Sequence, residues 1–307
     1  MVEFNALSRG PLRTVFLFEK HAAGAEGNVA IGVSRLGCTS GIITRVSDDE
    51  FGSFLAATLK AEGVDTSHVA LDKVYPTGVF FIQRGYPIPD KSEAYYYRHN
   101  SAGSKLNPQD IDPNYIAGAK VFHVSGITPA LSESAKEATA KAVRVAKENK
   151  VKVSLDTNIR LKLWNEQTAR TTLCKSADVL FTSVPDAKII IGLEEPNEIA
   201  KTLHKNGVGV VIIKLGTKGA FASSGSETLT QPIFPSIVED PTGAGDSFAA
   251  TFLATMLQGW KLQRSLRAAS ATASLVVSVR GDYENIPNMG ALQTFLDYEQ
   301  GKTEYLR

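Results

Sequence analysis

The sequence lacks the features that mark several large classes of protein. Its two cysteines, Cys38 and Cys174, are too few for a disulfide framework or a zinc site. No apolar run approaches the roughly 20 residues that span a bilayer. The first residues, Met1–Asn5, have neither the basic start nor the apolar core of a signal peptide. We therefore expect a cytoplasmic protein in a reducing compartment.

An excess of charge of one sign is also missing. Lys and Arg number 33 and Asp and Glu number 32, which leaves a formal net charge of +1. The overall field therefore attracts neither nucleic acid nor an anionic membrane, and we expect neither as a partner. A composition of 43% hydrophobic and 21% charged residues is ordinary for a globular protein. Any anion that the protein binds must be held by a local site.

What the sequence does contain is an alternation of β-branched runs and helical patterns. Strands are predicted at Val121–Ser125, Val151–Asp156, Val179–Thr182 and Val208–Lys214, and helices at Ser132–Lys147, Glu166–Lys175 and Glu195–Lys205. Ser134 and Glu137 are spaced as a capping box for the first of these helices. Apolar strands between helices favour an α/β fold with a mostly parallel sheet that helices cover on both faces.

One segment interrupts this alternation. Val79–Ile82 and Ala94–Tyr97 are β-rich and are separated by the turn-rich Gly85–Lys91, with no helix between them. Antiparallel strands inserted into an α/β protein indicate a small lid beside the main sheet. An ordinary surface hairpin would give the same pattern.

The sharpest local signal is the segment Asp240–Phe248. Gly243 and Gly245 allow a tight turn and a close backbone approach to a ligand. The following residues place apolar side chains four apart, which predicts a helix that begins at this turn: Phe248, Phe252 and Met256. Free amides and the positive end of the helix dipole favour an anion there.

Asp246 lies in the same first turn, where a bound phosphate would repel its carboxylate. In a phosphoryl transferase the carboxylate has a purpose, because it accepts the proton of the attacking hydroxyl while the amides stabilise the transferring charge. A plain turn, with Asp246 interacting with the helix dipole, would also explain the segment. Neither a Walker motif nor a dinucleotide fingerprint is present.

Asp240–Phe248 resembles the C-terminal signature of the ribokinase-like (PfkB) carbohydrate kinases. Gly24–Ala30 resembles their earlier glycine-rich signature, and Val46–Gly52 resembles their G-x-D-x-x-G region, with Ser47 in the glycine place. The three segments follow one another in the family's order. The resemblance implies one ribokinase-like catalytic domain over residues 1–307, with a small antiparallel β lid contributed mainly by about residues 69–104.

Further stretches resemble the archaeal 2-keto-3-deoxygluconate kinases of this family: Phe80–Arg84, Tyr95–Arg98, Ser101–Ser104, Asp156–Trp164 and Val279–Asp282. This resemblance implies ATP-dependent phosphorylation of the C6 hydroxyl of 2-keto-3-deoxygluconate, and in some members of the galactonate epimer. It assigns Asp246 as general base and the amides of Gly243, Ala244 and Gly245 as anion hole.

The same resemblance names the residues that bind the sugar acid: Gly24, Asn28, Phe80, Tyr96, Arg98, Arg160, Asp246 and Asp282. It places Arg160 on both the carboxylate and the transferring phosphoryl group, to which a planar guanidinium is well suited. Taken without the resemblance, the residues leave other roles open. Either arginine could make a surface ion pair, Phe80 and Tyr96 could pack within the lid, and Asp282 could belong to a plain turn.

The nucleotide side of the site is implied by Lys214–Gly219, which resembles the family's strand-then-turn stretch. The resemblance assigns Lys214, Gly216 and Gly219 to the nucleotide, together with Gly243 and Gly245. The implied cofactors are ATP and Mg²⁺. No metal ligand is named, because the family's N-x-x-E stretch is altered here to Ser183–Asp186. The resemblance also implies a homo-oligomer, since lid strands in this family often pair between subunits.

The chain departs from its relatives at the start, because Glu3–Leu7 matches only the tail of the family's opening strand. We expect an upstream start, and a longer chain with that strand restored should be more soluble and more active. Two classes of function compete with the sugar-acid kinase: another kinase of the same family acting on fructose, ribose or a nucleoside, and a non-catalytic sugar-acid sensor. A sensor would have no need of the base Asp246. The missing fingerprint argues against a dehydrogenase on a similar sheet.

Overall fold

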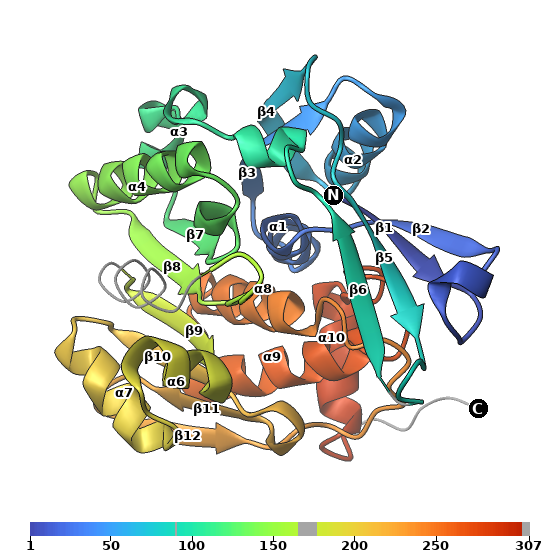
Figure 1. Cartoon of the computed structure of the whole chain (residues 1–307). Coiled ribbons are helices and arrows are strands. Elements are labelled where there is room, and N and C mark those ends of the chain that lie inside the picture. Colours follow the sequence, from blue (N-terminus) through green and yellow to red (C-terminus); the bar gives the residue numbers. More distant parts are fainter. Residues whose placement is uncertain (90, 165–176, 303–307) are drawn as a thin grey trace. The chain divides into compact units, whose positions relative to one another are not determined.

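The computed structural model describes residues 1–89, 91–164 and 177–302. The chain divides into two compact units (Figure 1). The first unit consists of Met1–Lys105, Pro235–Gly259 and Ala271–Arg307, and the second of Leu106–Phe234 and Trp260–Ser270. Each unit is thus assembled from segments that are distant in the sequence. That the two form one catalytic domain stays a prediction.

The first unit contains a four-stranded sheet in the order β2-β1-β5-β6 (Figure 1). Its strands are β1 (Val2–Ala6), β2 (Phe18–Ala22), β5 (Val79–Arg84) and β6 (Ser92–Tyr97). β5 and β6 are antiparallel, as predicted, and β1 is parallel to β5 and antiparallel to β2. The predicted lid segment, about residues 69–104, supplies only half of this sheet, which we call the lid sheet.

Strand register gives the lid sheet two different faces. Glu3 lies opposite Phe80, and Phe80 lies opposite Tyr96. Because side chains alternate along a strand, these three share one face. The other face is aromatic: the rings of Phe4 and Phe81 stack at 5.1 Å between centroids, and Tyr97 meets Phe81 edge-on at 5.8 Å.

The rest of the first unit supports this sheet. The parallel strands β3 (Ser40–Ser47) and β4 (Val64–Asp72) form a separate two-stranded sheet. The helices of this unit are α1 (Ala25–Arg35), α2 (Glu50–Ala61), α8 (Ala244–Leu257) and α10 (Met289–Tyr298). α1 and α8 pack closely, since a Cβ at Gly32 would lie 2.6 Å from the Ala250 Cβ. The expectation of an upstream strand stays a prediction.

The second unit contains a six-stranded sheet in the order β12-β11-β10-β9-β8-β7. Its strands are β7 (Val121–Ser125), β8 (Lys152–Asp156), β9 (Val179–Ser183), β10 (Val210–Lys214), β11 (Ala220–Ser223) and β12 (Thr228–Gln231). β7 to β10 are parallel, and β11 and β12 are joined antiparallel at one edge. The predicted mostly parallel sheet is therefore confirmed, together with the four strands predicted for it.

Helices of the second unit are α3 (Pro113–Ala117), α4 (Glu133–Glu148), α6 (Val184–Ile191) and α7 (Pro196–Lys205), and α9 (Leu262–Val276) is divided between the units. The predicted capping box at Ser134 and Glu137 is wrong. Ser132, whose backbone is still extended, is the N-cap of α4, and its Oγ accepts from the Ala135 amide at 3.1 Å. Ser134 already lies inside the first turn. The helix predicted at Glu166–Lys175 lies outside the described residues.

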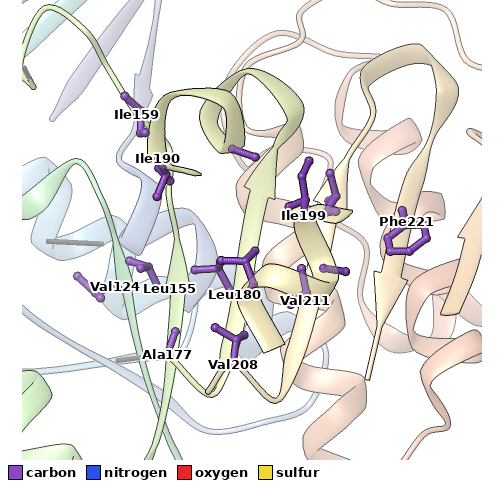
Figure 2. Close-up of a cluster of buried hydrophobic side chains, with 14 of the residues drawn as sticks. Val124, Leu155, Ile159, Ala177, Leu180, Ile190, Ile199, Val208, Val211 and Phe221 are labelled. Carbon is purple, nitrogen blue, oxygen red and sulfur yellow. The ribbon is translucent and has the colours of Figure 1, made fainter. Parts of the chain in front are cut away.

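The continuous apolar strands of the second unit build its core (Figure 2). Leu155, Leu180 and Val211, from three neighbouring parallel strands, contribute buried side chains to one cluster. Ile190 of α6 and Ile199 of α7 complete it, so these helices cover one face of the sheet. In the part of the chain that the structure describes, no helix has both the length and the apolar composition needed to cross a membrane.

Candidate active site

The turn before α8 depends on a glycine. Gly243 is the N-cap of the helix and has a φ of 74°, in the left-handed region that favours glycine. A Cβ there would lie 1.8 Å from the carbonyl oxygen of Asp282, so a larger residue would displace that backbone. The amides of Ala244 and Gly245 lie in the first helical turn, where they have no intrahelical acceptor. They can therefore bind an anion.

A single side-chain amide connects the two carboxylates of the site. Asn28, in the first turns of α1, donates from Nδ2 to Asp246 Oδ2 at 2.8 Å and to Asp282 Oδ2 at 2.9 Å. The backbone amide of Gly24, the N-cap of α1, also donates to Asp282 Oδ2 at 3.3 Å. The structure therefore brings together four predicted site residues whose sequence positions span more than 250 residues.

The lid sheet groups three more of the predicted residues. The rings of Phe80 and Tyr96 stack at 5.1 Å between centroids, and the guanidinium carbon of Arg98 lies 4.2 Å from the Tyr96 ring centroid. Phe80 is 3% exposed and Tyr96 is 40% exposed. The buried Phe80 ring therefore packs against one face of the Tyr96 ring. Tyr96 and Arg98 are partly exposed, so a ligand can reach them.

Two polar residues of this site were missed by sequence reasoning. Glu3 and Asn5 of β1 are both fully buried. Asn5 Nδ2 donates to Glu3 Oε1 at 2.6 Å and to Asp240 Oδ2 at 2.5 Å. The alternation in Val2–Ala6 puts Glu3 and Asn5 on the same face, but such a pattern ordinarily leaves its polar face to solvent, so no signal in the sequence indicates that this face is buried. Polar groups on a buried face need partners, and these point to an internal network.

His21 and Glu284 hold the turn that carries Asp282. His21 Nδ1 lies 2.6 Å from Glu284 Oε1. Burial by itself lowers the pKa of His21, but the hydrogen bond and charge of Glu284 outweigh it, so the pKa is raised. Gly281, with a φ of 102°, leaves room for this pair, since a Cβ there would lie 2.8 Å from His21 Nδ1.

The second unit contains the predicted residues Arg160 and Lys214. Arg160 is exposed and follows the end of β8. Its loop is held by Asp186, whose Oδ2 accepts from Thr157 Oγ1 at 2.7 Å and from the Ile159 amide at 3.3 Å. Asp186 therefore has a structural task within this unit.

Lys214 has a carboxylate partner of its own. Its Nζ lies 2.6 Å and 2.9 Å from the two carboxylate oxygens of buried Asp156. This pair joins the ends of β10 and β8 in the second unit. A direct contact of Lys214 with a nucleotide would have to compete with it.

The turn after β10 has the backbone that a close ligand approach needs. Gly216 and Gly219 have φ values of 61° and 98°. A Cβ at Gly219 would lie 2.0 Å from the Gln231 carbonyl oxygen, whereas one at Gly216 would meet nothing within 4 Å. Gly219 is thus required by the fold, and Gly216 leaves open space for a ligand.

Metal binding by protein side chains alone finds no support in residues 1–89, 91–164 and 177–302, where no cluster of three His, Cys, Asp or Glu side chains could hold an ion.

Burial lowers the pKa of His123 to about 4, with the charge of Lys214 acting in the same direction. His123 is therefore neutral near pH 7, and its Nδ1 lies 2.9 Å from Ser154 Oγ.

Comparisons with known proteins agree over nearly the whole chain. Residues 1–289 match the model of the pfkB family of carbohydrate kinases. The 2-dehydro-3-deoxygluconokinase of Thermoproteus tenax is 41% identical over 293 residues, covering 94% of this chain and 89% of the relative. The solved 2-dehydro-3-deoxygluconokinase of Thermotoga maritima is 25% identical with a TM-score of 0.90, covering 96% and 95% of the two chains. A candidate ribokinase II from E. coli, solved with ATP and Mg²⁺, is 28% identical with a TM-score of 0.91, covering 97% and 96%.

Proposed function

Because the chain belongs to the pfkB family of carbohydrate kinases, and is thus a sugar kinase, we propose that it phosphorylates the C6 hydroxyl of 2-keto-3-deoxygluconate with ATP. The observation that carries the proposal is the placement of Asp246. Its carboxylate is oriented by Asn28 and lies in the first turn of α8, beside amides that can bind an anion. The choice of a sugar acid is supported by the 41% identity to a kinase of this substrate.

Asp246 is the general base in this proposal. Its carboxylate accepts the hydroxyl proton while the C6 oxygen forms a bond to the γ-phosphorus. The bond from that phosphorus to the β–γ bridging oxygen breaks, and its electron pair leaves with ADP. The amides of Gly243, Ala244 and Gly245 stabilise the charge on the transferring group, as oriented backbone donors do.

The substrate carboxylate needs a cation, and Arg98 is the candidate in the first unit. The Tyr96 ring orients its guanidinium, and a planar donor fork matches a carboxylate. Gly24, Asn28 and Asp282 are proposed to bind the sugar hydroxyls, because donors and acceptors already converge there. Arg160 is proposed to bind both the carboxylate and the transferring phosphoryl group.

ATP and Mg²⁺ are the proposed cofactors, and the residues present suit a nucleotide. The open space at Gly216 and the left-handed turn at Gly243 permit close approach of phosphates to the backbone. Mg²⁺ would neutralise phosphate charge, and it commonly keeps several waters and phosphate oxygens as ligands. Lys214 and Gly219 are proposed to shape the nucleotide turn rather than to bind phosphate directly.

The test is a coupled ATP-consumption assay on purified protein. The substrates are 2-keto-3-deoxygluconate, its galactonate epimer, gluconate, fructose and ribose, and Asp246→Asn is measured alongside. We expect turnover on the keto-deoxy acids alone and a loss of at least about 10²-fold in the variant, because the base is removed.

Turnover on fructose or ribose would contradict the sugar-acid assignment while leaving the kinase family intact. A variant that keeps full activity would contradict the role of Asp246. Binding of the sugar acid without turnover would favour the sensor.

We also propose that the aromatic face of the lid sheet pairs with a second copy of the chain. Tyr97 on this face is 66% exposed, and Phe16, which precedes β2, is 90% exposed. Covering such side chains removes apolar surface from water.

A further inference from the structure

Two carboxyl groups, those of Glu3 and Asp282, each have a buried oxygen without a hydrogen-bond donor in the described part of the chain. Glu3 is fully buried and Asp282 is 4% exposed. Within the described residues, Glu3 Oε2 and Asp282 Oδ1 have no donor to accept from. A buried carboxylate oxygen without a donor is costly, because it has lost its hydration and gained nothing.

One proton satisfies both oxygens. The side chains of Glu3 and Asp282 lie within hydrogen-bonding contact of each other. If both were ionised, two like charges would meet in a site from which water is excluded, so one of them must take up a proton. A protonated carboxyl group becomes a donor, and its O–H can point at the partner's unpaired oxygen.

The donors around each group decide which one keeps the proton. Asp282 Oδ2 accepts from Asn28 Nδ2 and from the Gly24 amide, and both bonds favour its charged form. Glu3 accepts one hydrogen bond, from Asn5, and the same Asn5 amide also serves Asp240. Asp240 has the Thr242 amide and hydroxyl as further donors, at 3.0 Å and 2.6 Å. Glu3 is therefore the group with the least support for a charge.

We propose that Glu3 is a protonated positioning residue, which donates to Asp282 and thereby fixes Asn28 and the Asp246 carboxylate. The chain of contacts runs from Glu3 to the Asp282 carboxylate, from Asp282 Oδ2 to Asn28 Nδ2, and from Asn28 Nδ2 to Asp246 Oδ2. Glu3 acts through its neighbours and not on the substrate. This inference rests on the proposed function, because Asp246 is its end point.

The burial of Glu3 and the charges around it also favour its protonated form. Burial raises the pKa of Glu3 to about 10, the charges of Asp282 and Asp240 raise it as well, and the hydrogen bond from Asn5 opposes them. Burial also raises the pKa of Asp282, against the hydrogen bond from Asn28. Other charged groups that interact with Asp282 include Glu284, His21 and the Met1 amino group.

A held proton has a thermodynamic consequence that does not depend on activity. The unfolded chain releases the Glu3 proton near its usual pKa of 4.5, whereas burial beside Asp282 raises the pKa of Glu3 in the native protein far above that value. The unfolded state therefore binds fewer protons between these values, and Glu3 destabilises the native state progressively as pH rises. Glutamine has the shape of a protonated glutamate but no proton to lose.

The experiment compares chemical unfolding of the wild type and Glu3→Gln between about pH 6 and pH 9. We expect the wild-type unfolding constant, divided by that of the variant, to rise about tenfold per pH unit. Glu239→Gln is the matched control, since the Arg84 ion pair lowers the pKa of Glu239 and its effect should not vary over this range. A ratio for Glu3→Gln that stays constant with pH would overturn the proposal.

Kinase assays show whether Glu3 acts by positioning the Asp246 carboxylate or only by filling space. Glu3→Gln should keep kcat within about threefold, because its amide can donate to Asp282 and accept from Asn5. Glu3→Met, which fills similar space without a donor, should lower kcat by about tenfold or more and leave the KM for ATP unchanged. A folded but inactive Glu3→Gln would refute the assignment, because a neutral donor at this position would then not keep the site active. If no substrate is turned over, the proposed function fails, while the unfolding ratio still decides the state of Glu3.

Discussion

Asn28 connects the carboxylates of Asp246 and Asp282, because both accept a hydrogen bond from its side-chain amide. The two hydrogens of one amide nitrogen serve Asp246 and Asp282 separately, which a hydroxyl group with its single hydrogen could not do. Its own backbone amide donates to the Gly24 carbonyl at 2.8 Å, so the first turn of α1 sets its place. The orientation of the candidate base is thus decided by a neutral group.

Arg98 gives a residue-scale prediction about substrate choice. Arg98→Ala should raise the KM for 2-keto-3-deoxygluconate by about 10- to 100-fold, because a charge-assisted hydrogen bond to a carboxylate is lost. Arg98→Lys should recover only part of the affinity, since an ammonium lacks the planar fork. The KM for ATP should not change in either variant.

Steady-state kinetics with each substrate varied in turn provide the measurement. Arg13→Ala is the control, as Arg13 is exposed in a short helix near the lid sheet. An unchanged sugar-acid KM in Arg98→Ala would exclude Arg98 from carboxylate recognition.

At the scale of elements, the contacts at the start of α2 explain the residues of Val46–Gly52, the stretch that resembles the family's G-x-D-x-x-G region. Gly52 is required because a Cβ there would lie 1.9 Å from the Ser47 carbonyl oxygen. Asp49 is the N-cap of α2, and its Oδ1 accepts from the Gly52 amide and from Thr77 Oγ1, both at 2.7 Å. Its Oδ2 accepts from the Thr77 amide at 3.0 Å. The Ser47–Gly52 stretch therefore fastens the helix to the segment before β5.

Asp49→Ala should lower the free energy of unfolding by about 2 kcal/mol at pH 7, because it removes a helix cap and a tether. Asn288→Ala is the comparison. It removes the cap of α10, which makes one exposed bond to the Ala291 amide, and should cost about 1 kcal/mol. Urea unfolding of both variants measures the difference, and equal losses would contradict the tether to Thr77.

The Asp49 contribution should also depend on pH in a stated direction. Burial tends to raise the pKa of Asp49, but the hydrogen bonds from Gly52 and Thr77 prevail and lower it to about 2 from its usual 3.8. A depressed pKa stabilises the native state above the unfolded value and is lost as pH falls through the folded one. The gap between wild type and Asp49→Ala should therefore narrow from about pH 5 towards pH 2.

At the scale of the whole molecule, surface chemistry limits the kinds of partner. The near balance of positive and negative residues provides no field for steering a polyanion. The aromatic face of the lid sheet is different, because Tyr97 is exposed and lies beside Phe81, which is itself half-buried. A second copy of the chain could cover this apolar surface.

Tyr97→Lys should shift the protein from oligomer to monomer, since a charge placed in an apolar interface must be desolvated. Size-exclusion chromatography with light scattering measures the mass. Ile237→Lys serves as control, because Ile237 is 84% exposed and lies away from the lid strands in the sequence. A monomeric wild type would refute pairing through the lid sheet.

The sequence by itself determined the local elements, including the turn at Gly243 and the helix α8 that begins there. Apolar runs predicted β7 to β10, because a strand buried on both faces needs apolar side chains throughout. Two glycines followed by a helical pattern predicted this turn and helix, and the anion site with Asp246 as base stays a prediction. Both signals are short-range, so periodicity and spacing reveal them.

Only the tertiary structure decided which distant residues pair with the polar groups of the candidate site. Asn5 and Asp240 are 235 positions apart, and Asn28 and Asp282 are 254 apart. Lys214 similarly meets Asp156 across 58 positions, which changes its expected role. No local pattern encodes such pairs, because strand pairing and helix packing bring them together. Burial then forces each polar group to find a partner, and this requirement gives Glu3 its proposed proton.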